Sequence, residues 1–445
     1  MANAAPRPIL SGSFFLPLVE RIRERGSKKR KSRPQQRPHA KRRRQEDRSR
    51  RAGRAFEPEQ APLVERVLLL LATAAPDLGR WLALGLALLT VAMLQLWRGA
   101  RSGNGGLTLC ALSRTLPLDE KEKARSKRLY RLLRNASLDG TEMTPLLVRL
   151  ALGSCPSGWI PMVVDQTDVQ GTQVIMAGIR VAQRILPVAF TCYEYDKIRK
   201  SQNAIENSLL LLIAACLPPG CKPLFVMDRG YARASLLNQL RSLNIPFLIR
   251  GRSHTMVWVD GKRLSLGRLR YRRGRPQRYT NATYQDSARE PVDIVVFHDP
   301  AFQEPWFLLL PAGSEAQLPS ADVVALYRQR MHIELTFRDW KTHLGVRGLH
   351  LEADPALRLG RLLLALSGAY ILAVLLGSGE LAPRVRAHCE VLRSQPRHGT
   401  KRRLSALSVG ILALSLARFA DLVRAELDRI LAALQRGLPT TEISQ

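Results

Sequence analysis

Cysteine, aromatic residues and acidic residues are all scarce in this sequence. None of its cysteines forms a CxxC pair, so the sequence predicts neither a zinc site nor a disulfide framework and fits a reducing cytosol. The cysteines are Cys110, Cys155, Cys192, Cys216, Cys221 and Cys389. A secretory signal is not expected either, because the basic run follows the apolar Phe14–Val19 patch where the opposite order is required.

Acidic residues are too few to balance the charge. The chain has 37 Asp or Glu against 69 Lys or Arg, a formal net charge of +32 and a pI near 11.0. Such an excess points to a polyanionic partner, of which nucleic acid is the commonest, although membrane surfaces and acidic proteins also attract cations. Residues 21–54 hold 17 Lys or Arg and three acids, so much of the excess lies elsewhere in the chain. This distribution favours an extended nucleic-acid contact over a single basic arm.

Residues 1–60 lack apolar periodicity and are rich in Arg, Pro and Gln, which predicts a disordered basic tail. Its clusters Lys28–Lys31 and Lys41–Arg44 would be nuclear-import signals in a eukaryote. A non-specific DNA-binding arm and an over-extended start of the reading frame are equally compatible readings.

Long apolar runs are also few. Trp81–Trp97 is nearly free of charge but reaches only the lower length limit for a bilayer span, Gln95 shortens it, and both flanks are basic. Leu362–Leu376 is interrupted by Ser367 and Gly368 and is too short to span. We therefore expect buried helices and no membrane association.

Residues 61–155 are expected to form a helical DNA-binding region. Helices are predicted at Leu107–Thr115 and Lys121–Leu133, and the second is strongly basic. A basic helix beside a short one suits a DNA groove, but the same pattern fits a merely solvated face. The candidate DNA contacts are Lys127, Arg128 and Arg131.

The chain changes character after residue 155. Residues 156–250 show strand, strand, strand, helix, strand, helix, strand, the order of a mixed α/β sheet. Residues 251–316 carry β patterns alone, with Asp260–Gly261 as a hairpin turn, and so predict a β-rich insertion. Residues 317–380 return to helix and complete the core, and 381–445 form a C-terminal helical region.

One helix, predicted over 327–341, combines charge with an apolar edge. Its members Tyr327, Arg330, Glu334 and Lys341 have offsets that place them within an arc of about 60°. An adjacent arc is apolar, as in a helix packed on a core along one edge. The apolar members are Leu326, Ile333, Phe337, Trp340 and Leu344. Taken alone, such a stripe also fits an amphipathic surface helix whose charges are merely solvated.

Two further acids give the stripe a chemical context. Asp165 and Asp228 each close a short apolar strand, and strand ends lie where ligands reach a sheet. Glu334 is a third acid, from the helix after the insertion. Three carboxylates from separate elements, without a Cys or His cluster, are the ligand set of a hard divalent ion such as Mg²⁺. Two solvated strand-end acids remain the alternative.

These residues carry a resemblance. The segments Asp165-Gln-Thr167 and Asp228-Arg-Gly-Tyr231, with the Tyr327, Arg330, Glu334 and Lys341 series, resemble the three motifs of bacterial insertion-sequence DDE transposases, in the branch with the YREK signature. The basic segment 121–135 also resembles the amino-terminal DNA-binding region of that family. The likeness covers about residues 105–420.

The resemblance implies an α/β fold with a ribonuclease H-like catalytic core, a β-rich insertion and a preceding helical DNA-binding region. It implies that Asp165, Asp228 and Glu334 are catalytic and hold two Mg²⁺ ions, for which Mn²⁺ can substitute. Tyr327, Arg330 and Lys341 would contact DNA. The implied enzyme cleaves transposon-end inverted repeats and joins the 3′-OH ends to target DNA, as a homodimer on double-stranded DNA in the bacterial cytoplasm, associated with the nucleoid. The alternative is a decayed, non-catalytic DNA-binding protein.

Overall fold

The structure is a computed structural model that describes residues 56–99, 107–153, 158–198, 201–390 and 403–437. The described residues all belong to one compact unit, Phe56–Gln445. Most of the predicted disordered tail and its two basic clusters lie outside the described residues. The architecture below is that of this unit.

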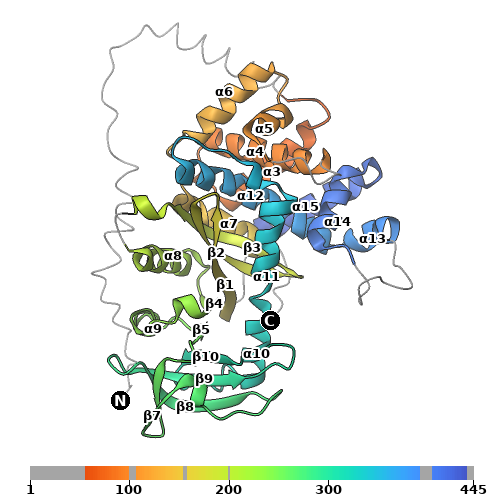
Figure 1. The fold of residues 1–445 in the computed structure, drawn as a ribbon. Helices are drawn as coiled ribbons and strands as arrows, with labels where there is room; N and C mark the ends of the chain where they lie inside the picture. The colour runs from red at the N-terminus through yellow and green to blue at the C-terminus, as the bar shows by residue number, and fades with distance from the viewer. Residues whose placement is uncertain (1–55, 100–106, 154–157, 199–200, 391–402, 438–445) are drawn as a thin grey trace, which may run out of the picture. The chain divides into compact units, whose positions relative to one another are not determined.

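One mixed sheet of ten strands forms the centre of this unit (Figure 1). Its order is β3-β2-β1-β4-β5-β10-β9-β8-β6-β7. Strands β1 (Gly158–Val169), β4 (Cys221–Met227) and β5 (Phe247–Arg250) are parallel to one another, and β2 (Thr172–Val181) and β3 (Arg184–Tyr193) extend the sheet as antiparallel hairpin partners. A mixed α/β fold with this order is consistent with the expected ribonuclease H-like core.

The predicted insertion does not form a sheet of its own. Its strands are β6 (Met256–Val259), β7 (Lys262–Ser265), β8 (Gln277–Tyr284), β9 (Glu290–Phe297) and β10 (Trp306–Pro311). Strand β10 pairs with both β5 and β9, so these residues lengthen the central sheet. The expected hairpin turn is confirmed, since Asp260 and Gly261 both have positive φ between β6 and β7.

Strand β1 is longer than its sequence predicts. Asp165 was expected to close it, but β1 continues to Val169 because its hairpin with β2 continues, and Asp165 pairs with Met176. The parallel pairing with β4 does stop just before Asp165, at Val164 opposite Met227. Asp165 therefore marks the point where β1 leaves β4, with its side chain only 18% exposed.

Helices flank both sides of the sheet. Figure 1 shows α8 (Gln202–Cys216) and α9 (Ala234–Ser242) on one side, and α10 (Ser320–Gln329) and α11 (His332–Arg338) on the other. Helix α8 begins at a side-chain cap, where Ser201 accepts a hydrogen bond from the amide of Ala204, and its buried face includes Leu209 and Ile213. These helices bury the two faces of the strands that carry the candidate acids.

The region before the sheet is helical, as predicted. It contains α3 (Ala61–Ala74), α4 (Arg80–Gly99), α5 (Leu109–Thr115), α6 (Glu122–Leu133) and α7 (Gly140–Leu152). Thr108 and Asp139 cap α5 and α7 by accepting hydrogen bonds from backbone amides near the start of each helix. Helix α7 packs on β3, which joins this region to the sheet.

Helix α12 (Pro355–Ser378) forms the largest buried helical core. Among the described residues, α4 and α12 are long and apolar enough to cross a membrane, and the bent pair α14 with α15 would be a third such span. The expectation that the α12 segment is too short was wrong, because the helix continues for 24 residues. In this structure 94% of its apolar window is buried against β3, β2, α4 and α14.

The C-terminal region consists of α13 (Ala382–Cys389), α14 (Ala406–Ser415) and α15 (Ala420–Arg436). Two glycines allow α12 and α14 to cross backbone to backbone. A Cβ on Gly377 would lie 1.7 Å from the carbonyl oxygen of Ala406, and one on Gly410 would lie 1.8 Å from that of Ala373. The crossing therefore requires glycine at both positions.

Candidate active site

Adjacent parallel strands bring the first two acids together. Asp165 follows the last β1 residue that pairs with β4, and Asp228 follows the last residue of β4. The two acids therefore lie side by side where these neighbouring parallel strands end their pairing. The charge of Asp228 raises the pKa of Asp165, so the two carboxylates lie within electrostatic range of each other. The edge is where a ligand reaches an open α/β sheet.

A tight turn holds Asp228 in place. Its Oδ1 accepts a hydrogen bond from the amide of Gly230 at 2.8 Å, and the residue caps the short 3-10 helix Arg229–Tyr231. A Cβ on residue 230 would lie only 3.0 Å from that oxygen. The glycine thus permits the carboxylate to fold back over the turn and accept the Gly230 amide.

The predicted continuous helix over 327–341 is broken. Helix α10 ends at Gln329, α11 begins at His332, and residues Asp339–His343 form a π-helical turn. The four residues of the stripe therefore do not lie on one regular helix. Gly345 ends the segment with a positive φ, as expected from its sequence position.

Arg330 stands at the break and faces the acids. Its Nη1 donates a hydrogen bond to Oδ2 of Asp165 at 2.8 Å, and its Nη2 lies 3.6 Å from Oε1 of Glu334. The Arg330 side chain is 11% exposed, whereas that of Glu334 is 55% exposed. The guanidinium thus lies between a largely buried acid, Asp165, and a solvent-exposed acid, Glu334.

Burial changes the ionisation of Asp165. Removal from water raises its pKa to about 6, and the charges of Asp228 and Glu334 act in the same direction. Arg330 and the hydrogen bond from the Gln166 amide oppose the shift by lowering the pKa. All three predicted acids are therefore electrostatically coupled at one place in the folded chain.

The other two residues of the stripe lie differently. Tyr327 is 2% exposed and packs its ring against Trp306 at 5.1 Å, while the Arg330 guanidinium lies 5.8 Å from its ring centroid. In this placement the Tyr327 ring is buried beside Arg330, and its contact with DNA stays a prediction. Burial lowers the pKa of Lys341, and so does the charge of Arg347, while the charge of Asp168 raises it, so Lys341 lies within electrostatic range of Asp168.

The apolar edge of the stripe fixes the segment on the sheet. As predicted, Ile333, Phe337 and Trp340 are buried. A buried ion pair adds to this anchor: Arg184 of β3 donates to Asp339 at 2.5 Å, and the Tyr370 hydroxyl of α12 donates to the same carboxylate at 3.0 Å. The pair fixes the end of the segment, at Asp339, to strand β3.

A buried polar group beside the acids was missed by sequence reasoning. Glu206 of α8 is 4% exposed and pairs with Arg233 at 2.6 Å. The ring of Tyr231 lies next to it, 4% exposed, and its hydroxyl has no hydrogen-bond partner among the described residues. The signal in the sequence was the single acid in the otherwise uncharged stretch 202–216.

Helix α6 presents the predicted basic face. Lys127, Arg128 and Arg131 are exposed, and Tyr130 between them is 47% exposed. Arg128 is held by Glu120, so it is less available than the other two. Leu129 and Leu133 bury the opposite face. These contacts place the cations on the surface, and their role in DNA binding stays a prediction.

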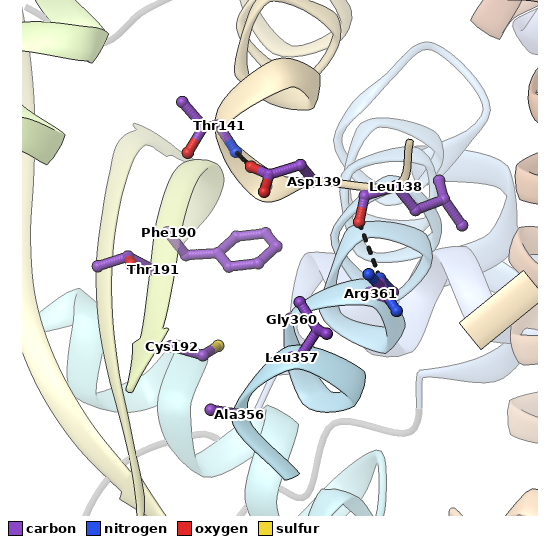
Figure 2. A pocket seen from close by; sticks show the side chains of 11 residues that line it. Leu138, Asp139, Thr141, Phe190, Thr191, Cys192, Ala356, Leu357, Gly360 and Arg361 are labelled. Carbon is purple, nitrogen blue, oxygen red and sulfur yellow. Dashed lines mark hydrogen bonds between the residues drawn. The ribbon is translucent and has the colours of Figure 1, made fainter. Parts of the chain in front are cut away.

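A separate pocket of about 130 Å³ lies between α7, β3 and α12 (Figure 2). The polar groups that line it are already engaged: Asp139 accepts a hydrogen bond from the amide of Thr141 at 2.7 Å, and Arg361 donates to the carbonyl of Leu138 at 3.2 Å. None of the three predicted acids lines it. We therefore interpret this pocket as a packing gap between the helical region and the sheet.

Metal binding by the three predicted acids stays a prediction in this arrangement. In the part of the chain that the structure describes, no three His, Cys, Asp or Glu side chains are close enough to hold an ion. The donor chemistry nevertheless fits a hard divalent cation, because the coupled groups are carboxylates and a cation already lies among them. That cation is the Arg330 guanidinium, so a metal would have to displace it.

These features define an α/β protein with a carboxylate site at the edge of a mixed sheet. Residues 193–368 match the family model described as the transposase DDE domain. The match includes Asp228 and Glu334 but begins after Asp165, and it covers less than half of the chain. It supports a DDE transposase. No curated protein matches the chain.

Proposed function

We propose that the chain is a DNA transposase that cleaves at transposon-end inverted repeats and joins the freed 3′-OH ends to target DNA. The observation that carries the proposal is the coupling of Asp165, Asp228 and Glu334 around one sheet edge, inside or beside the segment that matches the transposase DDE domain. The YREK branch is supported by Tyr327, Arg330 and Lys341, of which Arg330 faces the acids.

The three acids would hold the metal. Asp165 and Asp228 come from the rigid strands, and the exposed Glu334 side chain would close the site after a rotamer change. Two Mg²⁺ ions, or Mn²⁺ in their place, would supply a nucleophilic water and stabilise the leaving 3′ oxygen. The Asp165 carboxyl is half ionised near its pKa of about 6 and approaches a full negative charge well above that pH.

The cations have separate tasks in this proposal. Arg330 neutralises Asp165 in the free protein and binds a DNA phosphate once it is released, since guanidinium matches phosphate oxygens in a bidentate way. Lys341 contacts the backbone further along. Tyr327 would position Arg330 by packing its buried ring beside the guanidinium. Lys127, Arg128 and Arg131 on α6 bind the duplex away from the cut.

Synapsis of two ends requires two copies, so we place the working enzyme as a homodimer on double-stranded DNA, in the cytoplasm and without a membrane. The burial of α12 within the fold supports the last point. An alternative is a decayed transposase that only binds DNA, which the incomplete metal centre favours.

The test uses the full chain with a duplex that carries the ends of its own element and Mg²⁺. We expect nicking by the wild type and none by Asp165→Asn, Asp228→Asn or Glu334→Gln. The matched control is Asp322→Asn, an exposed acid on α10. Binding without nicking by the wild type would select the decayed form, and full nicking by Glu334→Gln would remove Glu334 from the ligand set.

A further inference from the structure

The connection between β7 and β8 carries five exposed arginines. We name residues 266–276 the arginine loop; its members Arg268, Arg270, Arg272, Arg273 and Arg275 are exposed, and the segment contains no acid. Arginines just outside the loop do have acidic partners, since Arg263 pairs with Asp286 and Arg278 with Asp293. Among the described residues, no ion pair is formed by the five loop arginines.

The arginine loop is fixed to the sheet. Leu266 is fully buried, and the amide of Gly267 donates to the carbonyl of Ser253 at 2.7 Å. The Tyr279 hydroxyl donates to the carbonyl of Arg270 at 2.5 Å, and the amide of Gly274 donates to that of His298 at 3.0 Å. The five cations are therefore presented on a defined backbone.

This arrangement works against stability in the free protein. Arg272 and Arg275 face each other across an antiparallel bridge, in a turn that Gly274 closes with a φ of +73°. Like charges directly opposite each other repel and destabilise a strand pair. A polyanion bound to the loop would reduce that repulsion, so the cluster favours anion binding.

We propose that the arginine loop binds the phosphate backbone of double-stranded DNA at a distance from the cut. Strand β8, which follows the loop, lies four strands from β4, or about 20 Å at the usual strand spacing. One turn of duplex is about 34 Å long, so a DNA held at the acids reaches the loop within a single turn. Guanidinium groups pair with phosphate oxygens, and the half-exposed Tyr271 adds a hydroxyl for the same backbone.

Duplex DNA suits this surface better than a lipid surface. Membrane-binding segments combine cations with several apolar side chains that enter the bilayer, and Tyr271 is the one large apolar residue exposed on the loop within the described chain. The proposal rests on the proposed function only for which DNA is bound; the affinity of the loop for duplex phosphates is tested separately.

The test compares the full-length wild type with Arg272→Gln/Arg273→Gln/Arg275→Gln. The probe is a mixed-sequence duplex of about 40 base pairs, roughly four helical turns, in EDTA, with affinity measured over a range of salt. Each lost phosphate contact lowers the slope of log K against log salt by about 0.9, so we expect a decrease of about 2 to 3 and at least about tenfold weaker binding at low salt. The control, Lys222→Gln/Arg384→Gln/Arg436→Gln, removes the same charge from exposed positions elsewhere and should leave the slope unchanged.

An unchanged slope in the loop variant overturns the proposal, as does an equal decrease in the control, which would report net charge alone. A loss confined to phosphatidylserine vesicles, with DNA binding intact, also overturns it. The cleavage assay separates the two proposals. If the wild type cuts no DNA but the salt slope falls in the loop variant, the loop site is kept and the transposase is rejected. If the wild type cuts DNA but the slope of the loop variant is unchanged, the transposase is kept and the loop site is rejected.

Discussion

Arg330 donates a hydrogen bond to Asp165 at 2.8 Å, although 165 positions separate the two residues in the sequence. The contact places a guanidinium where the proposed chemistry needs a metal ion. It therefore couples the release of Arg330, which a DNA phosphate can drive, to the availability of Asp165 for metal.

Removal of the Arg330 charge should have opposite effects on metal binding and cleavage. At pH 8, where Asp165 is ionised, Arg330→Gln should bind Mn²⁺ about tenfold more tightly without DNA, because the competing cation is gone. The same variant should cleave poorly, because the phosphate contact is gone too. Electron paramagnetic resonance of free Mn²⁺ measures the first and a nicking assay the second. Arg338→Gln, an exposed neighbour, is the control, and unchanged Mn²⁺ affinity in Arg330→Gln would contradict the coupling.

Asp165 should make stability depend on pH. Its folded pKa, about 6, is above the value of about 4 in an unfolded chain, so its contribution is present below pH about 4 and is lost as pH rises through 6. Asp165→Asn cannot ionise and escapes that loss. In EDTA the variant should gain up to about 3 kcal/mol over the wild type at pH 8 and almost nothing at pH 4.

Urea unfolding of both proteins over this pH range measures the difference, in which other titrating groups cancel. Asp168→Asn, at an exposed acid of the same strand, is the control and should show no comparable rise with pH. A difference between wild type and Asp165→Asn that stays flat from pH 4 to 8 would show that burial does not dominate this site.

The buried Asp339 carboxylate should be a major anchor of the Arg330 segment. Asp339→Ala leaves Arg184 buried without its partner, and the expected cost is about 3–5 kcal/mol of unfolding free energy. Tyr370→Phe removes a hydroxyl that bonds Asp339 at 3.0 Å and Thr336 at 3.4 Å, and it should cost about 1–2 kcal/mol. Thermal and urea unfolding rank the two variants. Equal small losses in both would mean that the ion pair does not hold this segment.

Basic residues of α6 should differ in role, some binding DNA and one stabilising the fold. Lys127→Gln/Arg131→Gln should weaken duplex binding and lower the salt slope by about 2 without loss of stability, since both side chains are exposed. Arg125→Gln should instead destabilise the fold, because that side chain donates to the carbonyl oxygens of Arg114 and Leu116 and pairs with Glu57. Electrophoretic mobility shifts and melting curves test the pair. A stable Arg125→Gln with impaired DNA binding would reverse these roles.

Local patterns were sufficient for several elements. The Asp260–Gly261 turn, strands β6 and β8, the buried faces of Ile333 and Trp340 and the helical region before the sheet were predictable, because turn chemistry and apolar periodicity are short-range properties. Fixed offsets linked Arg330 to Glu334 in the sequence, and the ends of two apolar strands singled out Asp165 and Asp228.

Long-range contacts decided the rest. The sequence could not show that β10 joins β5, that Asp165 lies within a strand, or that the helix breaks at Arg330, since each depends on pairing or packing between distant segments. The Arg184–Asp339 pair and the glycines of the α12–α14 crossing are of the same kind. By itself, the sequence determined which charged side chains are available. The tertiary structure determined their partners, because burial and distance set the pKa of Asp165 and place Arg330 against it.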